Sequence, residues 1–134
     1  MAFLIDTDIA IHWRDRDPEV VRRTLAFRTA PSISIMTQIE LTNGIHARPD
    51  YAASRQVGVE KLYAFVQTIP FDGLVAHAYE AILAVTGFSR ARVFDRMIAA
   101  TAIAHGLTLV TMNGPDFRDI PGLTLEIWPA PAAQ

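Results

Sequence analysis

The sequence predicts an α/β protein with three layers, in which helices cover both faces of a central, mainly parallel sheet. Short β-rich runs alternate with longer helical segments along the chain, an order that is typical of parallel sheets. Hydrophobic residues make up 51% of the chain and charged residues 19%, which is enough apolar material for a packed interior. With 134 residues, the chain has about the length of one domain, so we expect a single domain over residues 1–134.

The elements of the first third follow from apolar runs and turn residues. Residues 2–5 are apolar and are cut by Asp6-Thr7-Asp8, which predicts a buried strand followed by a polar turn. Asp17 and Pro18 form an N-cap and first helical position, so we expect a helix to about Phe27. Residues 32–35 alternate with period two and predict a second strand.

The middle of the chain is mostly helical. Thr37 and Glu40 have the spacing of a capping box, which predicts a helix over 37–47. A further helix over 52–67 and a strand over 68–71 follow. Asp72 is expected to cap a helix that ends near Gly87.

The last third contains the clearest helix, which is rich in alanine, covers 93–105 and is followed by Gly106. A polar link with arginines, residues 89–92, precedes it. Two β-rich runs, 107–111 and 123–128, predict the final strands. We expect the Ala-Pro-rich tail 129–134 to be loose.

Composition excludes several classes of protein. The net charge is −2 and there is no cysteine, so binding of nucleic acid by bulk positive charge, a disulfide framework and a thiolate zinc site are all excluded. A carboxylate interrupts the opening apolar run, and we expect neither a signal peptide nor a membrane span. We therefore expect a cytoplasmic protein.

Four acidic residues are predicted to meet at one edge of the sheet. They are Asp6, Glu40, Asp95 and Asp116. Each follows a predicted strand or opens a predicted helix, and in right-handed βαβ units these ends share one edge. Each also has a local explanation: an Asx-turn, the capping box, the helix dipole and the cap of a short helix, respectively.

Asp95 indicates how such a cluster would be stabilised. Ile98, Ala99 and Ala102 share its helix face, so its carboxylate lies on an apolar stripe, where it needs a partner. Clustered carboxylates repel one another, and a divalent cation removes that conflict. Oxygen-only ligands favour Mg²⁺, or Mn²⁺, as the cofactor. The chemistry expected of such a site is activation of a water for phosphodiester hydrolysis.

The chain resembles the PIN-domain ribonucleases of the VapC toxin group. Four segments carry the resemblance: the opening Phe-Leu-Ile-Asp-Thr-Asp-Ile, the Ser-Ile-Met-Thr-Gln-Ile-Glu-Leu around Glu40, the Phe-Asp-Arg-Met-Ile-Ala-Ala-Thr-Ala around Asp95 and the Leu-Val-Thr-Met-Asn-Gly-Pro-Asp-Phe around Asp116. The resemblance implies a metal-dependent endoribonuclease with an α/β/α fold, the toxin of a toxin–antitoxin pair. It also implies an RNA substrate, a homodimer and a small antitoxin protein as partner.

Carried over by position, Asp6, Glu40, Asp95 and Asp116 form the acidic site, and Thr111 and Asn113 line it. The chain departs from the family pattern at Arg96 and Met112, which redistributes positive charge around the site. Arg90, Arg92 and Arg96 either contact phosphates or form ion pairs on a solvated surface. Asp8 either supports the site or caps the next helix.

Two other functions remain open from the sequence. Asp6-Thr7-Asp8 after a first strand also resembles the opening of haloacid-dehalogenase-type phosphatases, but the single lysine, Lys61, lies in no matching motif. A binding module that kept the fold without catalysis is the other. Turnover of phosphomonoesters would identify a phosphatase, and the absence of manganese binding would identify a binding module.

Overall fold

The computed structural model describes residues 2–131, so residues 132–134 of the predicted loose tail lie outside the described residues. Within that range a five-stranded sheet has the order β3-β2-β1-β4-β5. Its strands are β1 (Phe3–Ile5), β2 (Ser32–Ser34), β3 (Gln67–Ile69), β4 (Thr108–Thr111) and β5 (Leu125–Ile127). The pairings are all parallel, which confirms the predicted sheet.

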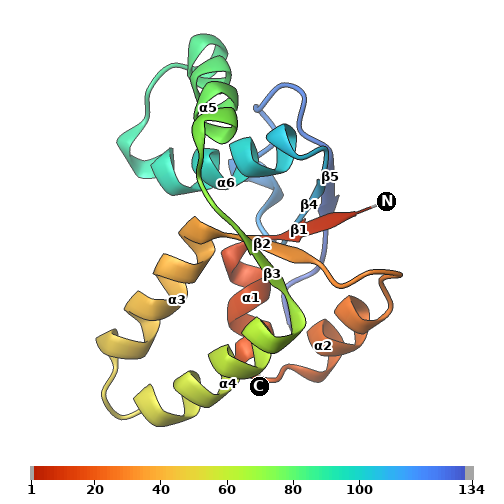
Figure 1. Cartoon of the computed structure of the whole chain (residues 1–134), viewed down its shortest axis with the longest axis vertical. Coiled ribbons are helices and arrows are strands. Elements are labelled where there is room, and N and C mark those ends of the chain that lie inside the picture. Colours follow the sequence, from red (N-terminus) through yellow and green to blue (C-terminus); the bar gives the residue numbers. More distant parts are fainter. Residues whose placement is uncertain (1, 132–134) are drawn as a thin grey trace.

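Helices occupy most of the connections between the strands (Figure 1). They are α1 (Thr7–Arg14), α2 (Pro18–Leu25), α3 (Ile35–Ala47), α4 (Ala52–Phe65), α5 (Gly73–Thr86) and α6 (Val93–Ala104), with the short 3-10 helices η1 (Arg90–Arg92) and η2 (Gly114–Asp116). Among the described residues, no helix combines the length and the apolar character needed to cross a bilayer.

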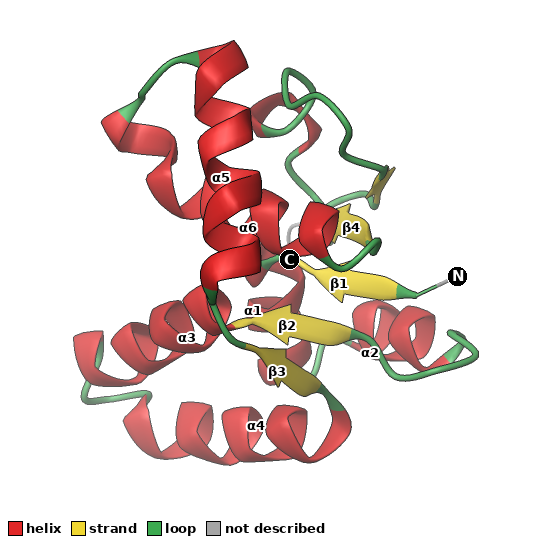
Figure 2. Ribbon diagram, turned by 45° about the horizontal axis from the view of Figure 1, so that its top comes forward, coloured by secondary structure: helices red, strands yellow, loops and turns green. Residues whose placement is uncertain are grey.

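The sheet separates two hydrophobic cores. In β1, Leu4 packs into one core and Ile5 into the other. Leu109 and Val110 of β4 divide in the same way, because successive side chains of a strand point to opposite faces. Figure 2 shows the corresponding layers, with α5 and α6 on one side of the sheet and α1, α2 and α4 on the other. The predicted three-layer α/β/α architecture is confirmed.

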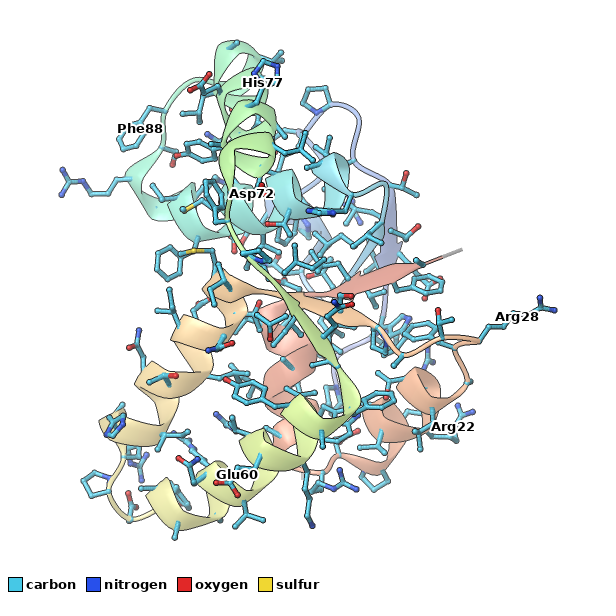
Figure 3. The ribbon with its side chains drawn as sticks, in the orientation of Figure 1. Arg22, Arg28, Glu60, Asp72, His77 and Phe88 are labelled. Atoms are coloured by element: carbon cyan, nitrogen blue, oxygen red, sulfur yellow. The ribbon has the colours of Figure 1, made fainter. Side chains whose placement is uncertain are left out.

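Several predicted helix boundaries are also confirmed. The side chain of Asp17 accepts a hydrogen bond from the Val20 amide at the start of α2. Asp72, which lies where β3 leads into α5 (Figure 3), does the same for Val75. Gly87 and Gly106 have φ angles of 77° and 64°, left-handed values that glycine adopts without steric cost at helix ends.

The predicted polar turn at Asp6-Thr7-Asp8 is wrong, because these residues begin α1. The Asp6 side chain accepts a hydrogen bond from the Thr7 amide and caps the helix. Ile9, Ala10 and Trp13 are buried on one face, which is the spacing that anchors a helix to a core. Asp6 therefore directly follows β1 and is the N-cap of α1.

The predicted capping box of Thr37 and Glu40 is also wrong. Helix α3 begins at Ile35, and the Ser34 hydroxyl accepts a hydrogen bond from the Met36 amide as its N-cap. Thr37 thus lies inside the first turn and is fully buried. The capping box therefore does not account for the presence of Glu40 at this position.

Candidate active site

The candidate site lies where the direction of the strand order changes. From β1 the chain runs outward to β2 and β3 in one direction, and β4 and β5 lie on the other side of β1. Ligands of open parallel sheets bind at the carboxyl ends of the strands beside such a switch point. Asp6 follows β1 there, and its amide donates to the Val110 carbonyl oxygen of β4.

Asp6 is the most buried carboxylate of this edge, with 5% of its surface exposed. Its Oδ1 accepts a hydrogen bond from the Thr7 amide at 2.8 Å, and its Oδ2 accepts one from Thr111 Oγ1 at 2.8 Å. Burial and then the nearby Asp8 carboxylate raise the pKa of Asp6 to about 8, against the lowering effect of these hydrogen bonds. A cation beside Asp6 would therefore favour its charged form.

Asp8 joins this site from the first turn of α1. Its Oδ1 accepts from the Ile9 amide at 2.7 Å, and its Oδ2 accepts from the Met112 amide at 3.0 Å. Burial raises the pKa of Asp8 above its ordinary value. The carboxylate holds the turn after β4 against α1, a role that differs from the helix cap considered from the sequence.

Glu40 reaches the site from α3 through Thr7. The Thr7 hydroxyl donates to Glu40 Oε1 at 2.7 Å, and Thr7 Oγ1 also lies 3.0 Å from Thr37 Oγ1. Asp6 and Glu40 are thus connected through the backbone and side chain of one residue. Glu40 itself is partly exposed, which leaves its carboxylate accessible from the sheet edge.

Asp95 lies in the first turn of α6 and is partly buried. Burial, followed by the carboxylates of Asp116 and Glu40, raises its pKa to about 6, while Arg92 lowers it. The carboxylates of Asp116 and Glu40 are therefore near enough to act on the charge of Asp95. Ile98, Ala99 and Ala102 are fully buried, which confirms that its helix face points into the core.

Asp116 is in η2 and is held by two neighbours. Asn113 Nδ2 donates to Asp116 Oδ2 at 2.5 Å. Arg92 Nη1 donates to the Asp116 carbonyl oxygen at 3.1 Å and lies 3.4 Å from its Oδ1. Asn113 and Arg92 are therefore both brought to the acidic edge.

The other two predicted arginines differ in their surroundings. Arg90 is exposed at the start of η1. Arg96 has 4% of its surface exposed. Its Nη1 donates to the Gly87 carbonyl oxygen at 2.6 Å, and its Nη2 lies 3.6 Å from Asp119 Oδ2. Since Asp95 and Arg96 are consecutive on a helix, their side chains diverge, and the structure does not bring Arg96 to the carboxylates.

The donor chemistry of the edge fits a hard divalent cation. Its ligands are carboxylate oxygens, which Mg²⁺ and Mn²⁺ prefer. Repulsion from Asp8 and Asp95 contributes to the raised pKa of Asp6. Repulsion from Asp116 and Glu40 contributes to that of Asp95, and a cation would relieve both. Within residues 2–131, however, no three such groups lie close enough together to hold an ion as they stand. The carboxylates converge without forming a preassembled cage.

The sequence does not reveal the roles of Thr7 and Thr37. Thr7 contacts Glu40 directly, and Thr37 contacts Thr7. Thr7 was interpreted as part of a turn and Thr37 as a helix cap, so neither hydroxyl was assigned to the site. The apolar residues Ile9, Ala10 and Trp13 have the spacing of a buried helix face. That spacing predicts a helix that begins at Thr7.

Comparison with protein-family models matches residues 3–123 to the PIN domain. The chain therefore belongs to the PIN-domain family. Within that family its curated relatives are VapC proteins. It is 30% identical over 132 residues to the tRNA(fMet)-specific endonuclease VapC of Salmonella typhimurium, covering 96% of this chain and 98% of that protein. The protein of the same name from Shigella flexneri is also 30% identical, with the same coverage.

Solved structures agree with this assignment. VapBC2 from Rickettsia felis, bound to a DNA fragment from its promoter, has a TM-score of 0.83 and 26% identity, covering 96% of this chain and 99% of that one. DNA-bound VapBC from Salmonella typhimurium has a TM-score of 0.83 and 29% identity, covering 96% and 98%. The fold and the full length of the VapC proteins are thus represented in this chain.

Proposed function

We propose that this chain is a metal-dependent endoribonuclease that hydrolyses RNA phosphodiester bonds as the toxin of a toxin–antitoxin pair. The observation that carries the proposal is the convergence of Asp6, Glu40, Asp95 and Asp116, from four separate elements, at the switch point of the sheet. The name of the Salmonella relative supports RNA as the substrate and an initiator tRNA as the first RNA to test.

In this proposal the four acids hold Mg²⁺ or Mn²⁺. The bound ion supplies a Lewis acid that makes water a stronger nucleophile at neutral pH and offsets charge on the phosphate. Asp6 and Asp95 contribute carboxylates whose pKa values are raised to about 8 and about 6, by burial first and by neighbouring carboxylates second. Glu40 from α3 and Asp116 from η2 would supply the other two carboxylates.

The polar residues around the acids orient them and the substrate. Thr111 fixes Asp6, and Asn113 fixes Asp116. Arg92 pairs with Asp116, and Arg90 is exposed two residues before it in η1. We propose that these two arginines contact RNA phosphates, since a guanidinium can donate two parallel hydrogen bonds to a phosphate. Arg96 is left out of this set because its guanidinium is buried elsewhere.

The partners are proposed from the relatives. VapBC complexes pair a toxin with an antitoxin, and we propose a small antitoxin protein for this chain and a homodimeric toxin. The absence of cysteine suits a reducing compartment, so we place the activity in the cytoplasm. We further propose that residues 1–134 act as one domain.

The proposal is tested by RNA cleavage with purified protein, Mn²⁺ or Mg²⁺, and matched variants. Asp6→Asn and Asp95→Asn should lower the cleavage rate by at least about a hundredfold, because each removes a charge that binds the ion. Glu60→Gln is the control, since Glu60 lies at the surface of α4 (Figure 3). Chelation by EDTA should abolish cleavage, and Mn²⁺ should restore it.

Three outcomes would contradict the proposal. Folded Asp6→Asn and Asp95→Asn variants that cut RNA at the parental rate would exclude the mechanism. Turnover of phosphomonoesters with RNA left intact would favour a phosphatase. A protein that binds no Mn²⁺ and cuts no RNA would be a binding module with a PIN fold.

A further inference from the structure

Thr7 contacts two acids of the site with two different groups. Its backbone amide donates to Asp6 Oδ1 at 2.8 Å, and its hydroxyl donates to Glu40 Oε1 at 2.7 Å. Asp6 follows β1, whereas Glu40 belongs to α3, so the two acids come from different elements. We infer that Thr7 is a positioning residue that fixes the separation of Asp6 and Glu40 and thereby sets the affinity of the site for a divalent cation. This inference rests on the proposed function.

The hydrogen-bond pattern fixes the direction in which the Thr7 hydroxyl donates its proton. A hydroxyl has a single proton, and an ionised carboxylate only accepts. With the Thr7 proton directed at Glu40, the 3.0 Å contact with Thr37 requires Thr37 Oγ1 to be the donor. Thr37 therefore orients Thr7, and Thr7 orients Glu40.

Burial makes this chain of hydroxyls costly to disturb. Thr37 is fully buried and Thr7 has 8% of its surface exposed. Buried hydroxyl groups that lose their partners cost free energy, because no water replaces the hydrogen bond. Thr7 is also β-branched and lies in a helix, which restricts its χ1 angle to few rotamers. The oxygen that meets Glu40 is accordingly held at a fixed place.

The effect of Thr7 on a bound cation follows from the arrangement of the carboxylates at this edge of the sheet. Within the described residues the carboxylates do not form a closed metal cage, so small shifts of each side chain decide how well an ion is held. Groups that hydrogen-bond to metal ligands from outside commonly change metal affinity by about 10- to 100-fold when they are removed. Thr7 donates such hydrogen bonds to both Asp6 and Glu40.

The test compares Mn²⁺ binding by isothermal titration calorimetry in folded variants. Thr7→Val keeps the shape and removes the hydroxyl, and it should bind Mn²⁺ about tenfold more weakly than the parent. Thr7→Ser keeps the hydroxyl and should restore most of the affinity. In a Glu40→Ala background, Thr7→Val should have an effect of less than about twofold, because the acceptor of the Thr7 hydroxyl is gone.

The inference is overturned if Thr7→Val binds Mn²⁺ as the parent does, if Thr7→Ser is as weak as Thr7→Val, or if the effects of Thr7→Val and Glu40→Ala simply add. Should Thr7→Val fail to fold, Thr37→Val decides, since it leaves the Thr7 hydroxyl without its donor. Weaker Mn²⁺ binding, restored by Thr37→Ser, supports the inference, and unchanged binding overturns it.

The same experiment separates this inference from the proposed function. A parent protein that binds Mn²⁺ without cutting RNA removes the proposed nuclease activity, and the calorimetric comparison still decides the role of Thr7. A parent that binds no Mn²⁺ removes both. A parent that binds and cuts, with Thr7→Val unchanged in both measurements, overturns the role of Thr7 alone.

Discussion

Thr111 Oγ1 donates a hydrogen bond to Asp6 Oδ2 at 2.8 Å, joining the last residue of β4 to the residue that follows β1. Both side chains are buried. The same hydroxyl oxygen accepts a hydrogen bond from the Asn113 amide at 3.0 Å, which directs its proton toward the carboxylates. This contact stabilises the charged form of Asp6 against the burial that raises its pKa to about 8.

Removal of the Thr111 hydroxyl should raise the pKa of Asp6 further. A hydrogen bond with a net value of about 1 kcal/mol corresponds to about 0.7 of a pH unit. In metal-free Thr111→Val, an NMR titration should therefore find the pKa of Asp6 higher by roughly that amount, because the charged form of Asp6 has lost a hydrogen bond. Thr111→Ser keeps the hydroxyl and serves as control. Identical titration curves of Asp6 in the parent and Thr111→Val would show that this bond does not tune Asp6.

The metal-free protein should lose stability as the pH rises. Asp6 and Asp95 have folded-state pKa values of about 8 and about 6, raised from 3.8. A raised pKa means that the folded state binds protons more tightly than the unfolded state, so the stabilisation is complete below pH 3.8 and is lost as the pH passes about 6 and about 8.

Thermal unfolding in EDTA measures this effect. Between mildly acidic and mildly alkaline pH, the contribution of these carboxylates should lower the Tm by about 5 °C or more. Asp6→Asn should reduce the decrease, because the asparagine does not ionise, and Mn²⁺ should oppose it at alkaline pH. A parent and an Asp6→Asn variant with the same pH dependence would contradict the assignment.

Arg96 offers a test of whether a buried arginine stabilises this fold. Within the described residues, its Nε is buried without a hydrogen-bond partner, and its ionic neighbour Asp119 is exposed. An apolar side chain of similar volume removes the cost of the unpaired donor. Arg96→Met should therefore change the free energy of unfolding by less than about 1 kcal/mol, whereas Arg96→Ala should destabilise by about 2 to 4 kcal/mol through the cavity that it leaves.

Urea unfolding of both Arg96 variants provides the measurement. The KM for RNA should be unchanged in Arg96→Met, because the guanidinium does not face the carboxylates. Equal destabilisation by methionine and alanine would mean that the charge and its hydrogen bond to Gly87 matter more than the volume. A raised KM in Arg96→Met would return Arg96 to the substrate-binding residues that the sequence predicted.

Gly58 should be intolerant of any side chain. It lies in α4, and a Cβ there would collide with the Arg14 carbonyl oxygen of α1. Gly58→Ala should destabilise by about 2 to 3 kcal/mol, because two backbones must separate. Gly73→Ala is the matched control, since a Cβ at that position meets nothing within 4 Å. A Gly58→Ala variant with the urea midpoint of the parent would show that α1 and α4 adjust without cost.

The sequence predicted the sheet and most helices because their signals are local. Asp17, Asp72, Gly87 and Gly106 are caps whose side chains or φ angles act on their own helix ends. The helix α1 was missed because its N-cap, Asp6, directly follows a strand, so that the polar triplet Asp6-Thr7-Asp8 had the composition of a turn. A helix whose first residues are polar and directly follow a strand is thus difficult to predict from local sequence patterns.

The site was only partly accessible from the sequence, for a related reason. Strand order explains why Asp6 and Asp95 approach one another, and that much follows from the parallel sheet. The contacts that orient the acids, such as Thr7 with Glu40 and Asp8 with the Met112 amide, depend on where side chains of distant elements meet. The position of Arg96 likewise depends on contacts with Gly87 at the end of α5 and with Asp119 after η2, and no local pattern encodes them.

The shortness of β1 has a consequence for how this protein can change over time. In three successive positions the chain supplies Leu4 to one core, Ile5 to the other and Asp6 to the sheet edge. A slip of one position exchanges the two faces of a strand, so a single inserted or deleted residue in β1 would displace the carboxylate and invert both cores at once. The candidate site and both cores thus depend on the same register of β1, which a change in the length of this strand would disturb.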